Sequence, residues 1–434
     1  MNTNYSCQNR IFLLEDLEES ALEALGSALT IDPLVLADHL FTYHFSQTHT
    51  IPHRKLPSLI NAERSFTLRY YELRETGHRV ADSQTGRRRT FAHASRQIES
   101  WQDLAEYQKE NSVDLVRHNI SFWCDEGLGR DQKQGAWNAI LLVDPPINSQ
   151  PVAGKNDGYY VLEKNDHKPW HSRIETSKPF RGGYSDLRPW QSSHTSTAPS
   201  RRSLFDDIIF YWLNSEKHEV DSVFENCVNT TLFAQQIVAS NWYELLDLQL
   251  KTLSNLDLTS KSKSDGSAGH TPSTSEWREE LNYYNKRLSL LGLLQRRLMW
   301  YKQEMLLNLE RLGFTPGESP NQAVASGLRT MGRDFQAILH ELDLRESRVD
   351  NLAGVVTDSI NLSNALRSVE DARIGLQLSI VGAIFFPITL VAAVFSMGGD
   401  YTPGAKKFWL PWVVAIPLVL ILIFMIWQTR RPRL

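Results

Sequence analysis

The sequence has few of the residues that mark a disulfide framework, a zinc site or a nucleic-acid-binding protein. Only three cysteines, Cys7, Cys124 and Cys227, occur in 434 residues. They lie far apart and match no zinc or redox spacing, which is typical of reduced thiols in a cytosolic portion. The net charge is only −4 and there is no long basic run. Nucleic-acid binding therefore has no electrostatic support.

Catalytic motifs are absent as well. The sequence has no phosphate-binding glycine loop, nucleophile elbow or dinucleotide-binding glycine pattern, so we expect neither an enzyme nor a bound cofactor. A histidine-rich stretch has no recurring metal-ligand spacing, and we predict a solvated loop there; it contains Asp38, His39, His44, His49 and His53. The N-terminal residues contain no apolar core of signal-peptide length, so targeting is expected to depend on C-terminal segments.

The composition changes along the chain predict several domains. Residues 1–230 indicate a cytosolic α/β domain, with strand-like apolar runs at 10–14, 66–73, 120–124, 136–143 and 159–162. Residues 231–318 indicate a helical region. It contains a Ser/Thr-rich segment, 254–275, that has too little apolar surface to order itself, so we predict a disordered linker there.

A long stalk helix is predicted for residues 319–373. Ser319 and Pro320 suit a helix start, and no proline follows until Pro387. Apolar residues recur in heptad phase at Leu328, Met331, Phe335, Ile338, Leu342, Val349, Leu352 and Val356. A helix that continued unbroken to residue 396 would be about 115 Å long, which favours a bundle of copies of the chain. The alternative is a set of shorter helices broken near Gly327, Gly332 or Gly354.

Two stretches near the C-terminus contain no charged residue and no histidine. They define predicted transmembrane helices at 374–396 and 408–427, because each is long enough to cross a hydrocarbon core of about 30 Å. The flanking arginines and the lysines of the connecting loop, 397–407, place both termini and the basic tail, 428–434, in the cytosol. We therefore expect a multi-pass protein with two spans in the lipid bilayer, in the plasma membrane rather than an organelle.

The first predicted span carries a row of small or weakly polar residues on one face. Alternating steps of four and three place these residues together: Gly375, Ser379, Gly382, Phe386, Thr389, Ala393 and Ser396. The row suits either close packing between helices or the lining of a pore. Two helices leave no closed interior, so a pore would need several copies of the chain.

The run Leu378–Asp400 resembles the end of the first membrane helix in the CorA magnesium-transporter family. That family shows a Phe-x-Pro-Leu-Thr pattern and a closing Gly-Met-Asn, and this chain has Phe385-Phe386-Pro387-Ile388-Thr389 with Met397 in the closing position. The order of α/β domain, long stalk and short second helix agrees with the family. The Ser-rich insertion resembles its divergent fungal branch. The resemblance implies a homo-oligomer, a pentameric funnel, that passes divalent cations such as magnesium passively.

The resemblance also implies roles for individual residues. The pore lining would comprise Gly375, Leu378, Ser379, Gly382, Phe386, Thr389 and Ala393. The outer mouth would comprise Ser396, Met397, Gly398 and Asp400, and a cytosolic basic ring would comprise Arg430, Arg431 and Arg433. The cation is the substrate and a possible regulator. Here Ser396-Met397-Gly398 replaces the family tripeptide. This change favours an alternative function, a non-conducting membrane-anchored scaffold or signalling protein.

Overall fold

The computed structural model describes thirteen segments of the chain. They are residues 9–40, 60–76, 88–90, 96–101, 112–126, 137–145, 152–153, 172–173, 203–215, 217–264, 274–314, 326–396 and 406–430. The chain forms two compact units, one of residues 1–271 with 286–353 and the other of residues 272–285 with 354–434. The predicted strand at 159–162 and the helix start at Ser319-Pro320 lie outside the described residues.

The first unit is built on an eight-stranded sheet centred on β5 (Ser112–Glu126). One edge of β5 pairs antiparallel with β2 (Ser65–Thr76) over twelve residue pairs. The opposite edge pairs with β4 (Gln97–Ser100) near its start and with β6 (Trp137–Val143) near its end. β1 (Arg10–Glu15) is parallel to β6. The short strands β3 (Arg88–Thr90), β7 (Val152–Ala153) and β8 (Ser172–Arg173) extend the sheet.

The strand prediction was correct for β1, β2 and β6 but too short for β5, which was expected only at 120–124. The part that was missed carries Arg117, His118 and Asn119, and all three are buried. Polar side chains interrupt the apolar pattern by which a strand is recognised. Their burial depends on partners from distant segments, which the local pattern does not contain.

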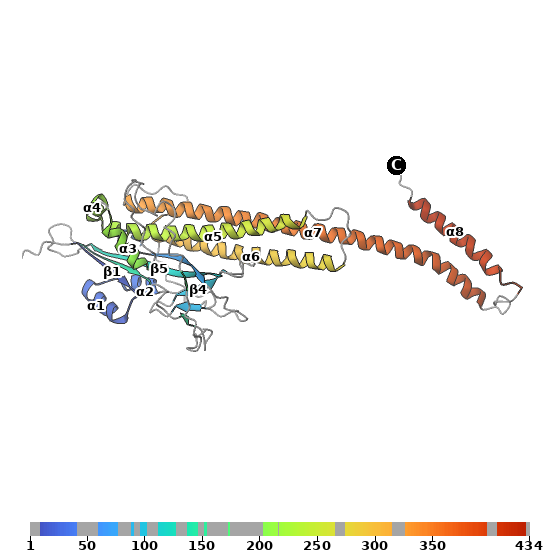
Figure 1. Ribbon diagram of the computed structural model, residues 1–434, viewed down its shortest axis with the longest axis horizontal. Helices are drawn as coiled ribbons and strands as arrows, with labels where there is room; N and C mark the ends of the chain where they lie inside the picture. The colour runs from blue at the N-terminus through green and yellow to red at the C-terminus, as the bar shows by residue number, and fades with distance from the viewer. Residues whose placement is uncertain are drawn as a thin grey trace, which may run out of the picture. The chain divides into compact units, whose positions relative to one another are not determined.

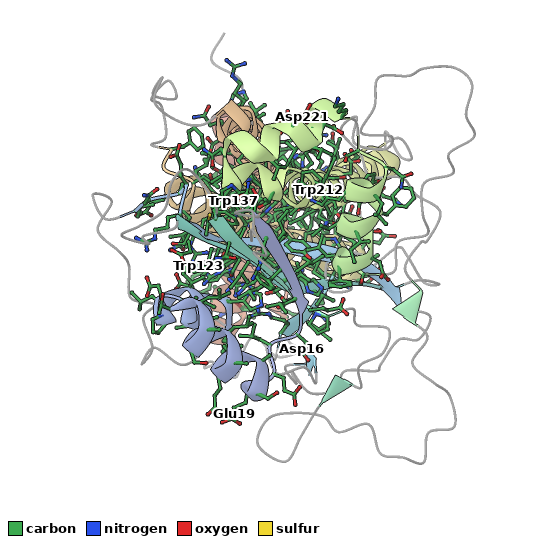
Figure 2. The ribbon with its side chains drawn as sticks, turned by 90° about the vertical axis from the view of Figure 1, so that its left-hand side faces the viewer. Asp16, Glu19, Trp123, Trp137, Trp212 and Asp221 are labelled. Carbon is green, nitrogen blue, oxygen red and sulfur yellow. The ribbon has the colours of Figure 1, made fainter. Side chains whose placement is uncertain are left out.

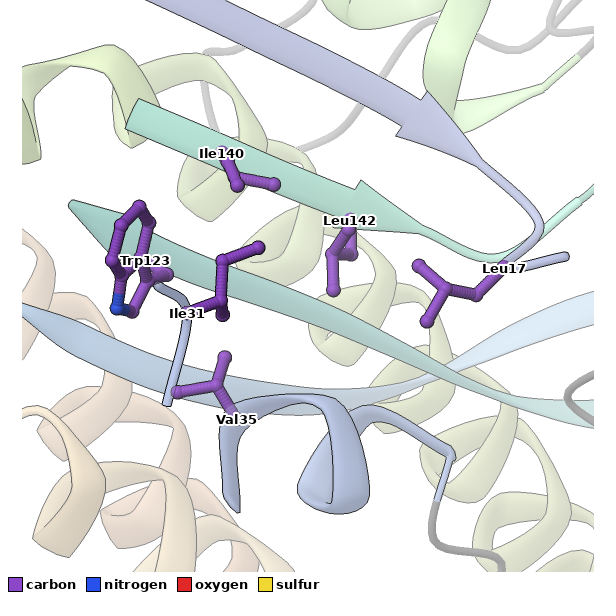
Figure 3. Packing of buried hydrophobic residues seen from close by; sticks show 6 residues of the cluster. All are labelled: Leu17, Ile31, Val35, Trp123, Ile140 and Leu142. Atoms are coloured by element: carbon purple, nitrogen blue, oxygen red, sulfur yellow. The ribbon is translucent and has the colours of Figure 1, made fainter. Parts of the chain in front are cut away.

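Helices cover both sides of the sheet (Figure 1). α1 (Glu19–Leu29) and α2 (Pro33–Leu40) lie on one side, where Leu17, Ile31 and Val35 pack against Trp123, Ile140 and Leu142 of the sheet (Figure 3). Figure 2 shows α1 on one side of the strands that carry Trp123 and Trp137, and α3 (Leu204–Leu213) with α4 (Lys217–Glu225) on the other. A 3₁₀ turn at Cys227–Thr231 leads into the long helices.

The second helical layer contains α5 (Leu232–Ser264) and α6 (Thr274–Arg311). The disordered linker predicted at 254–275 is therefore wrong for its first eleven residues, because α5 continues to Ser264. The reason is tertiary packing: Leu253 and Leu256 are buried, and the Arg287 side chain of α6 donates a hydrogen bond to the Leu256 carbonyl. Contact with a neighbouring helix stabilises a segment that would be marginal alone.

α7 (Ser326–Ser396) is one continuous helix of 71 residues, so the alternative of shorter helices broken at the glycines is wrong. Its heptad row is buried at Met331, Phe335, Ile338, Leu342, Val349 and Val356. The neighbours belong to the same chain: Lys302 of α6 pairs with Asp343 at 2.6 Å and with Glu346 at 3.0 Å, and Gln295 bonds Asp350. The heptad row from Met331 to Val349 therefore lies inside the first unit, whereas Val356 belongs to the second.

The open edge of β2 is closed by side chains from α5 and α6. Asn308 accepts from the Arg69 N–H at 3.0 Å and donates to the Arg69 carbonyl at 2.8 Å, as a neighbouring strand would. Trp242 donates to the same carbonyl at 3.0 Å. Tyr71, Trp242 and Tyr301 form a fully buried aromatic cluster beside this clamp. The clamp fixes the sheet to α5 and α6.

Candidate functional site

The predicted pore-lining residues all lie on α7, on the exposed side of the helix. The side chains of Leu378 and Phe386 are 71% and 70% exposed. The others are exposed as well: Gly375, Ser379, Gly382, Thr389, Ala393 and Ser396. The row is therefore not used for packing within the described part of the chain.

A second row on the same stretch of helix is shielded. Pro387 is buried, and the half-buried members of the row are Ile380, Ala383, Ile384, Ile388, Val391 and Phe395. At about 100° per residue, the centre of this row lies roughly opposite the small-residue row. The next helix, α8 (Leu410–Arg430), runs back from the end of α7 (Figure 1) and has a shielded row of its own, Pro411, Ala415, Val419 and Leu422. The small-residue row and the shielded row are therefore different faces of α7.

Two hydroxyl groups in the small-residue row are oriented by the helix itself. Thr389 donates its hydroxyl proton to the carbonyls of Phe385 and Phe386, at 3.1 and 2.9 Å, and Ser396 donates to the Ala393 carbonyl at 2.8 Å. With the proton engaged on the backbone, each oxygen presents its lone pairs. Oxygen lone pairs are what a cation, or the water shell of a cation, requires.

The same phase continues beyond the part of the row that was recognised in the sequence. Asn361, Asn364 and Ser368 fall on the same side of α7 and are exposed. Sequence reasoning missed them because it examined the row only inside the uncharged segment. The signal was available, since the alternating steps of four and three continue through Gly375 to these residues.

Several predicted site residues cannot be placed. Met397, Gly398 and Asp400 of the outer mouth and Arg431 and Arg433 of the basic ring lie outside the described residues. Arg430 is the last residue of α8, where only the backbone is described.

The predicted membrane segments can be compared with the length and apolar composition of the helices. Among the described residues, one helix is long and apolar enough to cross a membrane, with its candidate region at Met331–Ser396, and Leu410–Phe424 is a shorter apolar helix. The second span therefore remains a prediction.

The first unit contains a buried group of charges that sequence reasoning did not find. Glu304 of α6 accepts from Arg117 of β5 and lies 3.4 Å from Arg69 of β2, and all three side chains are buried. One carboxylate thus faces two guanidinium groups. These residues are separated by up to 235 positions, and no local motif marks such a pairing.

A second buried group joins α2 to the sheet. Arg96 donates two hydrogen bonds of 2.7 Å to the Asp144 carboxylate, and the same carboxylate accepts from the Asn119 N–H. Burial raises the pKa of Asp144, but Arg96, His118 and His39 lower it more, so it stays well below its usual range. His39, predicted to be in a solvated loop, is instead buried in α2. That prediction was wrong because Ser121 and Asp144 supply polar partners inside the fold.

Among the residues that the structure describes, no group of three or more His, Cys, Asp or Glu side chains is arranged to hold a metal ion.

The helical part of the chain was compared with known protein families. Residues 235–431 match the family model described as CorA-like Mg²⁺ transporter protein. This part of the chain is similar to that family. The match includes α5, α6, α7 and α8, and so confirms the resemblance recognised at Leu378–Asp400. No curated protein matches the chain.

Among solved structures, the chain is similar to the complete structure of the CorA magnesium transporter from Methanocaldococcus jannaschii. The sequences are 10% identical, and the match covers 96% of this chain and 89% of that one, with a TM-score of 0.37.

Proposed function

We propose that the chain assembles into a homo-oligomeric, pentameric membrane pore that passes divalent cations, magnesium or a related ion, down their gradient. Two α-helical spans form the membrane part of each copy, with both termini on the cytosolic side. The family match over 235–431 supports transport of Mg²⁺ or another divalent cation. We expect a conduit and not an enzyme.

One observation carries the proposal: the small, hydroxyl-bearing row of α7 is turned away from the row that is shielded within the chain. A row used only to pack α7 against α8 would be shielded. Copies of the chain arranged around an axis would instead bring the exposed rows together, so that Thr389 oxygens face hydrated ions and Phe386 and Leu378 form an apolar constriction.

The experiment is divalent-cation flux into liposomes that contain the purified protein, with Thr389→Leu compared with Val391→Leu. Both changes introduce leucine into the same helical turn, but Val391 is half-buried in the shielded row. We expect Thr389→Leu to abolish flux, because a ring of apolar groups would dehydrate the path, and Val391→Leu to retain most of it. Equal flux in both variants would assign Thr389 to helix packing.

A non-conducting scaffold is the second candidate, and Ser396-Met397-Gly398 favours it. In the family that this chain resembles, the asparagine at the position of Gly398 contacts the hydrated cation, and glycine has no side chain for that contact. A purified oligomer that passes no magnesium, cobalt, nickel, manganese or zinc would support the scaffold and contradict the pore.

A further inference from the structure

His118 of β5 lies between two carboxylates deep in the first unit. Its Nδ1 is 3.4 Å from Asp144, which follows β6, and its Nε2 is 3.1 Å from Glu72 of β2. The imidazole is 3% exposed and stacks on Tyr70, with the ring centres 5.4 Å apart. Both nitrogens of a single ring therefore face carboxylate oxygens from two different strands.

The arrangement favours the protonated ring, because each of its nitrogens lies within ion-pair distance of a carboxylate oxygen. The Asp144 carboxylate also pairs with Arg96. Loss of the proton from His118 removes a buried positive charge from between two carboxylates. The other histidine of the group, His39, faces Asp144 at 3.5 Å.

We propose that His118 is a proton-controlled latch: the protonated ring ties β2 to the end of β6 across β5, and loss of the proton releases β2. The device is a pH sensor built into the first unit, on the side of the membrane where that unit lies.

The direction of the response follows from the surroundings of the ring. Burial lowers the pKa of His118, but hydrogen bonding and charge from Asp144 and Glu72 outweigh burial and raise it above the usual value of 6.5. A raised pKa in the folded state stabilises the fold below the ordinary pKa, and this contribution is lost as the pH rises through the raised value. The latch is therefore closed below the raised pKa of His118 and opens as the pH rises through it.

A series of contacts connects the latch to α7. β2 carries Glu72 and, three residues earlier, Arg69, whose backbone is clamped by Asn308 of α6. α6 is joined to α7 by Lys302, which pairs with Asp343 and Glu346. α7 then continues without interruption to Ser396. We therefore expect opening of the latch to alter ion flux through α7. This effect on flux, unlike the latch itself, rests on the pore proposed above.

The primary test follows deuterium exchange at the C2 carbon of each histidine by mass spectrometry, on the full-length protein in detergent over a pH series. The exposed His340 of α7 serves as the control for labelling. We expect the His118 midpoint to lie above the ordinary histidine pKa of about 6.5, and Glu72→Gln to lower the His118 midpoint because one carboxylate is lost. A His118 midpoint at or below this ordinary value, or one unaffected by Glu72→Gln, overturns the latch.

The coupling between the latch and ion flux is tested separately. Flux into liposomes is measured at neutral and alkaline pH on the side of the membrane where the first unit lies. Wild-type flux should change with this pH, His118→Gln should lose the change, and His340→Gln should keep it. Flux of His118→Gln that follows pH as the wild type does overturns the coupling. Absence of flux in every variant, together with a raised His118 midpoint, contradicts the pore and leaves the latch supported.

Discussion

At the scale of single residues, the first unit depends on charges whose partners are distant in sequence. Glu304 with Arg69 and Arg117, and Asp144 with Arg96 and His118, are each buried beside β5. A buried ion pair adds little net stability compared with apolar packing, but removing one partner leaves an uncompensated charge and is strongly destabilising. These buried groups instead determine which strands and helices pack against one another.

Replacing Glu304 by glutamine should destabilise the first unit by about 3–5 kcal/mol, because two buried guanidinium groups lose the carboxylate that they share within the described contacts. Glu341→Gln is the matched control, since Glu341 pairs with Arg345 but its side chain is 43% exposed; about 0–1 kcal/mol is expected there. Thermal melting of the full-length protein followed by tryptophan fluorescence gives the comparison. Equal melting temperatures for the two variants would contradict the role of Glu304.

Acid should destabilise the unit through His39. Burial, with Arg96, lowers the pKa of His39 to about 4, against an ordinary value of 6.5, although Asp144 opposes the shift. The unfolded chain therefore binds a proton that the folded chain rejects, so stability falls as the pH drops from 6.5 towards 4, by about 3 kcal/mol in total. His39→Gln should show a shallower fall in melting temperature over this window. A slope identical to that of wild type would exclude His39 as the source.

At the scale of elements, a glycine decides how closely α6 and α7 approach. α6 ends at Arg311, and Gly313, two residues later, has a left-handed φ of 77°. The chain then places Phe314 against Gly332 of α7, where an added Cβ would overlap the Phe314 ring. The glycine that suggested a break in the stalk helix is thus a contact surface, and the helix continues through it.

Two glycine-to-alanine changes test this interpretation. Gly332→Ala should destabilise by about 1–3 kcal/mol, because the rigid ring must move. Gly292→Ala in α6 meets nothing within 4 Å and should stabilise by up to about 1 kcal/mol through helix propensity. The readout is the melting temperature of each variant. A gain at both positions would show that Phe314 does not occupy the space in front of Gly332.

At the scale of the whole molecule, the single chain leaves the small-residue row of α7 exposed while its heptad row is already buried. The expectation that the heptad row joins copies of the chain fails for the first unit, where α6 approaches it. In the proposed pore, copies would therefore associate through the row that contains Ser379 and Thr389.

If copies surround an axis lined by this row, a cysteine at Ser379 should form disulfide-linked oligomers in membranes under mild oxidation. Ile384→Cys is the control, because Ile384 belongs to the shielded row on the other face of the helix. We expect a ladder of linked species for Ser379→Cys and little beyond monomer for Ile384→Cys, in a background without native cysteines. The reverse pattern would place the shielded row at the axis and contradict the proposed pore.

The sequence by itself determined the features that depend on neighbouring residues. The uncharged segment within α7, the phase of the small-residue row, the heptad row and the strands β1, β2 and β6 all follow from local periodicity, because side-chain direction repeats at a fixed interval along a helix or strand. The tertiary structure alone decided the rest. It extended α5 to Ser264, placed His39 in the interior and brought His118 between Asp144 and Glu72. These outcomes depend on strand register and helix contacts between segments far apart in the chain, and buried polar groups are stable only where such partners meet them.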